Sequence, residues 1–261
     1  MTERILVTGG TGQLGRRVVE RLTASGLTVR VMSRRPRTEG SSTEWATADL
    51  RSGAGLRAAV DGVDVVIHLA FAMRDEPDAT GRLAEAALDA GVRHFIYIAI
   101  VGADRIPMGF MKVQVATEER IVASGLPVTL VRATQFHDLV RSMLATLAKS
   151  PVMFVPDVCV QAIDAGEVAD RLVELALGKP AGRVADVGGP EVHRLTELAR
   201  SYLRATGRRR PVVGFRIPGR AFRIYRDGAN LTPGNAYGSI TFEEYLARHP
   251  AARKTSYHIP V

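Results

Sequence analysis

Apolar runs alternate with segments of helical periodicity through the first half of the chain. The runs predict strands at residues 5–7, 28–32, 44–48, 63–70, 94–101 and 128–132. Helical spacing of apolar residues predicts helices near residues 14–24, 53–60, 79–90, 112–124 and 136–149. Apolar strands separated by helices indicate a parallel sheet that helices cover on both faces. The sequence therefore predicts an α/β protein with a doubly wound parallel sheet, whose ligands bind at the carboxyl ends of the strands.

The second half of the chain has shorter elements that prolines separate. We expect a helix from Asp164 through Leu177 and another at 195–205, and Thr241 with Glu244 resembles a capping box for a last short helix. No internal repeat or low-complexity linker marks a boundary. We therefore expect a single domain over residues 1–261. Its nucleotide-binding core lies at about 1–150, and a smaller C-terminal region at about 151–261 caps the substrate side.

Residues 8–15 read Thr-Gly-Gly-Thr-Gly-Gln-Leu-Gly, between the first apolar run and the first helical segment. In this context Gly9 permits a tight turn, Gly12 lets the backbone approach a pyrophosphate, and Gly15 lets the helix pack close to the strand. The free N–H groups at the start of the helix favour an anion. The motif predicts a dinucleotide site formed by Gly9, Thr11, Gly12, Gln13, Leu14 and Gly15.

The end of the second strand indicates which dinucleotide is bound. An acidic residue at this position usually holds the ribose of NAD, whereas this chain has Ser33, Arg34 and Arg35. Because a guanidinium suits a phosphate in charge and geometry, this tip favours NADP(H). The alternative is that both arginines belong to a solvated loop.

Two further segments complete the expected cofactor site. Asp49 and Leu50 follow the third strand, where they can contact the adenine ring, although Asp49 can instead cap the helix that follows. The loop Ala70, Phe71 and Ala72 follows the fourth strand and is expected beside the nicotinamide ribose.

Composition narrows the partners. The chain has 35 Lys and Arg against 27 Asp and Glu, a net charge of +8. The arginines are spread along the chain without a nucleic-acid-binding motif, so we expect an anionic small molecule and no nucleic acid. Cys159 is the only cysteine and the histidines lack metal-ligand spacing, so no metal is expected. No apolar run is long enough to span a membrane, and the first strand starts too early for a signal peptide. We therefore expect a cytoplasmic protein.

With these residues in place, the chain resembles the NmrA-like, atypical branch of the short-chain dehydrogenase/reductase superfamily. The matching stretches are 5–15, 48–50, 62–70, 95–104 and 123–138, with weaker likeness at 164–177 and 187–191. The resemblance implies a Rossmann fold that binds NADP(H) where the strand order reverses. It does not imply one activity, because this branch contains reductases, isomerase-like enzymes and catalytically silent redox sensors.

The resemblance also locates a missing catalytic set. Reductases of the superfamily place a serine at the end of the fifth strand and a Tyr-x-x-x-Lys pair on the next helix, and these positions correspond here to Ala99, Phe110 and Gln114. Gln114 remains a candidate that can hydrogen-bond a ribose or substrate oxygen. His137 follows the sixth strand and is a candidate proton donor, or else it only begins the next helix. A substrate phenol or a water can also supply the proton.

We expect an NADPH-dependent oxidoreductase that reduces a ketone, quinone or enone. Its substrate is a bulky, aromatic or polycyclic small molecule, because apolar residues near the strand ends are expected to form a pocket: Met73, Met108, Phe110, Met111 and Phe136. The alternatives are a non-redox cyclase, isomerase or dehydratase, and an NADP(H)-sensing regulatory protein without catalysis. The protein is expected to be a monomer or a homodimer.

Overall fold

The computed structural model describes residues 3–36, 43–72 and 75–249. The chain divides into two compact units that are interleaved in sequence. The first unit comprises Met1–Ala99, Lys112–Val131 and Gly166–Ala185, and the second comprises Ile100–Met111, Arg132–Ala165 and Asp186–Val261. Residues 100–111 and 132–165 belong to the second unit and residues 166–185 to the first, so the two units alternate along the chain. The single domain with a nucleotide-binding core at about 1–150 stays a prediction.

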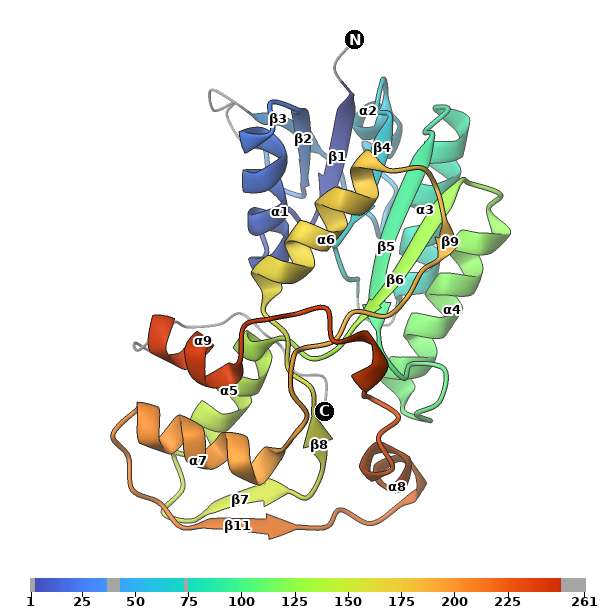
Figure 1. Cartoon of the computed structure of the whole chain (residues 1–261). Helices are drawn as coiled ribbons and strands as arrows, with labels where there is room; N and C mark the ends of the chain where they lie inside the picture. The colour runs from blue at the N-terminus through green and yellow to red at the C-terminus, as the bar shows by residue number, and fades with distance from the viewer. Residues whose placement is uncertain (1–2, 37–42, 73–74, 250–261) are drawn as a thin grey trace. The chain divides into compact units, whose positions relative to one another are not determined.

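A seven-stranded parallel sheet in the order β3-β2-β1-β4-β5-β6-β9 forms the centre of the first unit (Figure 1). Its strands are β1 (Arg4–Thr8), β2 (Thr28–Ser33), β3 (Thr43–Thr47), β4 (Val65–His68), β5 (His94–Ile100), β6 (Val128–Ala133) and β9 (Gly182–Arg183). The six strands predicted from the apolar runs are all present, and the two-residue β9 is an addition.

Helices cover both faces of this sheet, as the sequence predicted. On one face lie α1 (Gln13–Ala24) and α6 (Ala165–Leu177), which are joined by an ion pair between Arg21 and Asp170. The other face carries α2 (Leu56–Val60), α3 (Glu76–Asp89) and α4 (Gly109–Ala123). Arg120 of α4 lies 2.8 Å from Glu85 of α3. The fold class is thus a doubly wound α/β sheet.

The strand order reverses between β1 and β4. From β1 the chain builds β2 and β3 on one side, then crosses to β4 on the other side. Thr8 and His68 are the last residues of β1 and β4, and they are register partners. In open α/β sheets ligands bind in the crevice outside such a switch point. The sequence-predicted dinucleotide residues follow these strand ends.

The second unit has its own core. It contains α5 (His137–Leu147), α7 (Leu195–Ala205), α8 (Arg220–Arg226) and α9 (Phe242–Arg248). β7 (Met153–Pro156) pairs in parallel with β11 (Val212–Phe215), and β8 (Cys159–Val160) pairs antiparallel with β10 (His193–Arg194). Apolar side chains from α5, α7, α9 and β7 pack together, among them Leu144, Met153, Leu198, Tyr202 and Tyr245. The predicted capping box is present, since Thr241 Oγ1 accepts a hydrogen bond from Glu244 N at 3.2 Å.

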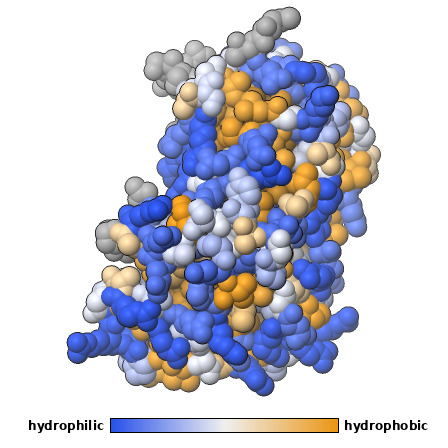
Figure 2. All heavy atoms as spheres, in the orientation of Figure 1, coloured by the Kyte–Doolittle hydropathy of each residue, from blue (hydrophilic) through white to orange (hydrophobic). Residues whose placement is uncertain are grey.

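Polar side chains cover most of the face drawn in Figure 2, and the apolar areas between them are separate. Hydropathy alone therefore marks no site on this face. Within the described ranges, no helix is long and apolar enough to cross a membrane.

Candidate cofactor site

The glycine turn between β1 and α1 has the close backbone approaches that its sequence predicts. Gly9 has a φ of +66°, and a Cβ placed there would lie 2.7 Å from the backbone of Leu69 and Ala70. A Cβ on Gly15 would lie 2.2 Å from the carbonyl oxygen of Gly9. Only glycine fits either position without moving backbone. These contacts bring the first turn of α1 against the glycine turn, and the glycine turn against the loop after β4.

The first turn of α1 offers hydrogen-bond donors without a protein cap. Gly12 is the cap residue, and among the described residues no side chain caps this helix and no acid lies in its first turn. Helix N-terminal amides left in this way form an anion site. The Oε1 atom of Gln13 is buried and has no hydrogen-bond partner in the part of the chain that the structure describes. Thr11 is exposed and Leu14 half-buried. The turn therefore fits a pyrophosphate and a hydroxyl donor beside it.

The tip of β2 carries two exposed cations. Arg34 and Arg35 are exposed, and Ser33 is half-buried with its Oγ accepting a hydrogen bond from Arg35 N at 3.2 Å. The described residues of this tip, 33–36, include no acid. The geometry thus leaves both guanidinium groups accessible to an anionic ligand.

Asp49 and Leu50 are engaged within the protein. Asp49 Oδ1 accepts a hydrogen bond from Arg51 N at 2.9 Å, which is a turn-capping contact. Leu50 is 7% exposed and belongs to the apolar core of the first unit. The capping alternative is therefore favoured for Asp49, and Leu50 offers little side-chain surface to an adenine ring.

The loop after β4 is held by side chains that the sequence analysis missed. Thr8 Oγ1 accepts hydrogen bonds from the backbone N–H groups of Leu69 and Ala70, both at 3.1 Å. Ala72 N donates to the carboxylate of Glu76 on α3. Phe71 between them is 41% exposed. The signal that could have found these side chains is a polar residue at the buried end of an apolar strand, as Thr8 is.

Gln114 lies buried on α4 in contact with Tyr97 of β5. Its side chain accepts a hydrogen bond through Oε1 from the Tyr97 hydroxyl at 3.1 Å. Burial raises the pKa of Tyr97 above its ordinary value, and the negative charge of Glu76 raises it further, so the phenol stays protonated and donates. This bond fixes the orientation of the carboxamide. No hydrogen bond from its Nε2 group to the described residues is found, and the residue is 4% exposed.

The catalytic positions named by the resemblance are occupied as expected. Ala99 is buried in β5 and has no hydroxyl, and Phe110 and Gln114 lie one helical turn apart on α4. Lys112 is exposed on the same helix. Exposure of Lys112 to solvent agrees with a surface residue and not with a replacement for the missing lysine at position 114.

His137 occupies a structural environment. Its ring is 1% exposed and lies between Phe242 and Tyr245 of α9, with ring centroids 5.6 and 5.1 Å away. Its Nε2 atom lies 2.9 Å from the carbonyl oxygen of Ile240, to which it donates. These contacts favour the alternative, in which His137 begins α5, and a catalytic role for His137 stays a prediction.

The expected apolar pocket residues are only partly described. Met73 lies outside the described residues. Met108 and Phe136 belong to the second unit together with Phe110 and Met111, and of these Met111 is buried while Met108 is 36% exposed. No group of three or more potential metal ligands is found among the residues that the structure describes.

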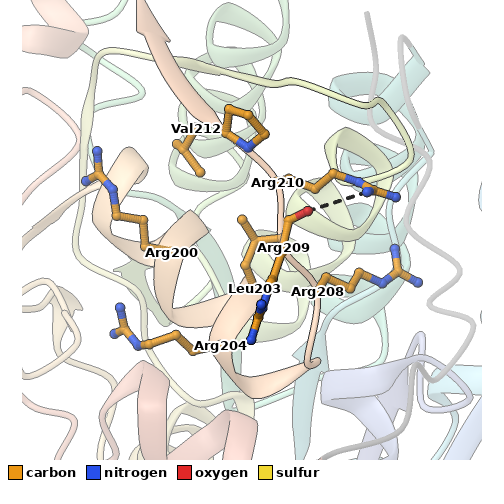
Figure 3. Close-up of a pocket in the computed structure, with 8 residues that line it drawn as sticks. Arg200, Leu203, Arg204, Arg208, Arg209, Arg210 and Val212 are labelled. Carbon is orange, nitrogen blue, oxygen red and sulfur yellow. Dashed lines mark hydrogen bonds between the residues drawn. The ribbon is translucent and has the colours of Figure 1, made fainter.

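The most basic segment of the second unit does not form a converging anion site. Five arginines, with Leu203, Pro211 and Val212, line an open hollow of about 500 Å³: Arg200, Arg204, Arg208, Arg209 and Arg210. In Figure 3 the guanidinium groups of Arg200 and Arg204 point to one side and those of Arg208 and Arg210 to the opposite side. Arg204 also pairs with Glu243 at 2.9 Å. This arrangement agrees with a solvated basic face.

Comparison with known proteins identifies the family of this chain. The model of the NmrA-like family matches residues 1–170. The chain belongs to the NmrA-like family.

Its relatives include proteins named as reductases. The chain is 32% identical over 212 residues to a (4-alkanoyl-5-oxo-2,5-dihydrofuran-3-yl)methyl phosphate reductase from Streptomyces griseus, covering 78% of this chain and 74% of the relative. It is 29% identical over 213 residues to an NAD(P)H azoreductase from Xenophilus azovorans, with the same coverage. A solved structure of an NADPH-dependent quinone oxidoreductase from Escherichia coli, complexed with NADPH, matches with a TM-score of 0.79 and 19% identity. That match covers 94% of this chain and 99% of the other.

Proposed function

We propose that this NmrA-like protein is an NADPH-dependent oxidoreductase that reduces a ketone, quinone or enone in a bulky, aromatic or polycyclic small molecule. The observation that carries the proposal is the uncapped first turn of α1 beside β2, whose tip carries Arg34 and Arg35 and, in its described residues, no acid. Relatives from two organisms are named as reductases, one of them for a phosphate ester and one for azo compounds.

NADPH is favoured over NADH by the charge of the β2 tip. A 2′-phosphate adds up to two negative charges at the position where NAD enzymes use a carboxylate. Arg34 and Arg35 supply two cations there, and a guanidinium binds phosphate oxygens through paired hydrogen bonds. A fold that presents these two arginines to solvent gains cofactor affinity from the phosphate instead of losing it to repulsion.

When bound, NADPH supplies the hydride of a reduction. The chain's own contribution is orientation: the amides of the α1 turn bind the pyrophosphate, and the Nε2 group of Gln114 donates a hydrogen bond to a ribose or substrate oxygen. Neither Ala99 nor Phe110 can donate a proton to that oxygen. The proton then comes from a water or from a phenol of the substrate. A positioned acid contributes about 10²–10⁴-fold in rate, so the reaction tolerates this loss with an activated substrate.

Calorimetric titration of the purified protein with NADPH and NADH tests the proposal. Arg34→Ala is expected to weaken NADPH binding by about 10–100-fold, the effect of losing one charge-assisted hydrogen bond or bidentate pair. NADH binding should change by less than about threefold, because the lost contact is made to the 2′-phosphate. Arg57→Ala is the matched control, since Arg57 is an exposed arginine on α2 of the same unit.

A panel of quinones, polycyclic ketones and enones then tests turnover. Oxidation of one NADPH for each carbonyl reduced supports the proposed reaction. Failure of the protein to bind NADPH overturns the proposal. Tight NADPH binding without turnover of any panel member leaves the cofactor assignment standing and refutes the substrate assignment. Equal losses for NADPH and NADH in Arg34→Ala refute the assignment of the arginine.

A further inference from the structure

Four buried polar side chains form a continuous chain of hydrogen bonds beneath the cofactor loops. They are Thr8, His68, Thr80 and Glu76, and each is 0% exposed. Thr8 Oγ1 lies 2.7 Å from His68 Nδ1, and His68 Nε2 lies 2.9 Å from Thr80 Oγ1. Thr80 Oγ1 lies 3.1 Å from Glu76 Oε1. Thr8 and His68 end strands of the sheet, and Thr80 and Glu76 lie on α3. Burying four polar side chains is costly unless each hydrogen bond is made, so the loss of one bond should affect the whole network.

The direction of every bond in the chain follows from its two ends. Thr8 Oγ1 already accepts two backbone N–H groups, so its own proton must point to His68 Nδ1. His68 is then a neutral imidazole with its proton on Nε2, which donates to Thr80. The Thr80 hydroxyl in turn donates to Glu76. His68 Nε2 also lies 3.6 Å from Glu76 Oε1, but a neutral ring makes this a polar contact and not an ion pair.

Both ends of the chain hold the loop after β4. At one end Thr8 accepts from Leu69 N and Ala70 N, and at the other Glu76 Oε2 accepts from Ala72 N. Three amides of a four-residue segment are thus tied to one buried network. A Cβ on Gly9 would lie 2.7 Å from Ala70 N, so the same segment packs directly against the glycine turn. Any shift of the loop therefore moves the wall of the expected dinucleotide site.

We propose that Thr80 and Glu76 are positioning residues, which act through His68, Thr8 and the Ala72 amide to fix the loop Leu69–Ala72 against the glycine turn for NADPH binding. The proposal rests on the proposed function, because it assigns the loop to the cofactor. Neither residue needs to touch the ligand. Glu76 lies on α3, and the hydrogen-bond network therefore couples the position of that helix to the cofactor site.

Thr80→Val tests this role, because valine has the shape of threonine without its hydroxyl. It removes the acceptor of His68 Nε2 and the donor to Glu76 together. The matched control is Thr129→Val at the opposite, amino end of the sheet, where buried Thr129 Oγ1 lies 2.8 Å from His94 Nε2. Both variants remove one hydroxyl from a buried Thr–His pair, so both lower the melting temperature. Thr80→Ser keeps the hydroxyl and serves as the conservative rescue.

Thr80→Val is expected to raise the NADPH dissociation constant about tenfold or more, while Thr129→Val and Thr80→Ser stay within about twofold of wild type. Nitrogen NMR of ligand-free wild type should show His68 neutral and protonated on Nε2. If wild type binds NADPH and the dissociation constants of Thr80→Val and Thr129→Val are equal, the positioning role alone is overturned. A charged His68, or one protonated on Nδ1, overturns the directed chain. Wild type that binds no NADPH overturns the proposed function and this role with it.

Discussion

Replacing Gly12 by alanine separates cofactor binding from folding more sharply than any other change in the glycine turn. Gly12 has φ −75° and ψ 178°, a conformation that alanine adopts without strain. An added Cβ would meet only the carbonyl oxygen of Gly9, at 3.1 Å, and open space otherwise. The free energy of unfolding of the variant should therefore lie within about 1 kcal/mol of the wild-type value. Alanine lowers the conformational entropy of the unfolded chain, and this gain offsets the slightly tight contact.

Under the proposed function, the same methyl group lies at the turn that the pyrophosphate is expected to approach. A phosphate oxygen sits about 2.8 Å from an amide nitrogen, whereas a carbon needs about 3.5 Å. Displacing the phosphate weakens one or two charge-assisted hydrogen bonds, each worth about 1.5–3 kcal/mol. At 1.4 kcal/mol for each factor of ten, the NADPH dissociation constant should rise about 10²-fold.

Calorimetric titration and thermal unfolding of the same samples measure the two effects together. Gly178→Ala is the control, because the nearest atoms to its Cβ lie at an ordinary 3.5 Å and it is remote in sequence from the glycine turn. Gly15→Ala provides the contrast, since its Cβ would lie 2.2 Å from Gly9 O and should cost about 1–3 kcal/mol of stability as well as binding. NADPH binding by Gly12→Ala within about threefold of wild type would refute the placement of the pyrophosphate.

Two further substitutions address the candidate catalytic groups. Gln114→Leu removes the carboxamide while nearly keeping the side-chain volume. We expect kcat/KM for the best carbonyl substrate to fall about tenfold and the free energy of unfolding to fall by about 1 kcal/mol. An unchanged kcat/KM would exclude the Nε2 group as a hydrogen-bond donor to the substrate. His137→Phe keeps the ring between Phe242 and Tyr245 but loses the bond to Ile240, so denaturant unfolding should show a loss of about 1–3 kcal/mol. The pH profile of turnover should be unchanged in His137→Phe, and loss of a limb of that profile would restore His137 as a proton donor.

Strands β1, β4, β5 and β6 were predictable because each is an apolar run that the parallel sheet largely buries. Their ends were less so. The fourth strand was expected at 63–70 but ends at His68, because the amides of Leu69 and Ala70 turn to the Thr8 side chain instead of a neighbouring strand. The helix expected near 79–90 begins earlier, at Glu76. Its start was not predicted because the first-turn residues are mostly polar and show no apolar periodicity. Thr8 and His68 are 60 positions apart, so no local pattern could show that they meet.

The parts of the site that depend on local backbone geometry can be predicted from the sequence, whereas those that depend on contacts between distant elements cannot. Gly9, Gly12 and Gly15 act through backbone geometry within one turn, and a single residue type at fixed spacing reveals them. Gln114 acquires its orientation only from Tyr97 on a different element, and Glu76 reaches Thr8 only through two intervening side chains. A cofactor site formed by one turn can therefore be predicted from a single sequence, whereas the orientation of side chains such as Gln114 depends on long-range contacts. The resemblance implies that the superfamily's proton donor is replaced at Phe110 and its carbonyl-positioning serine at Ala99. Under the proposed function we therefore expect activity to depend on those long-range contacts, and variants that perturb them without changing stability test this most directly.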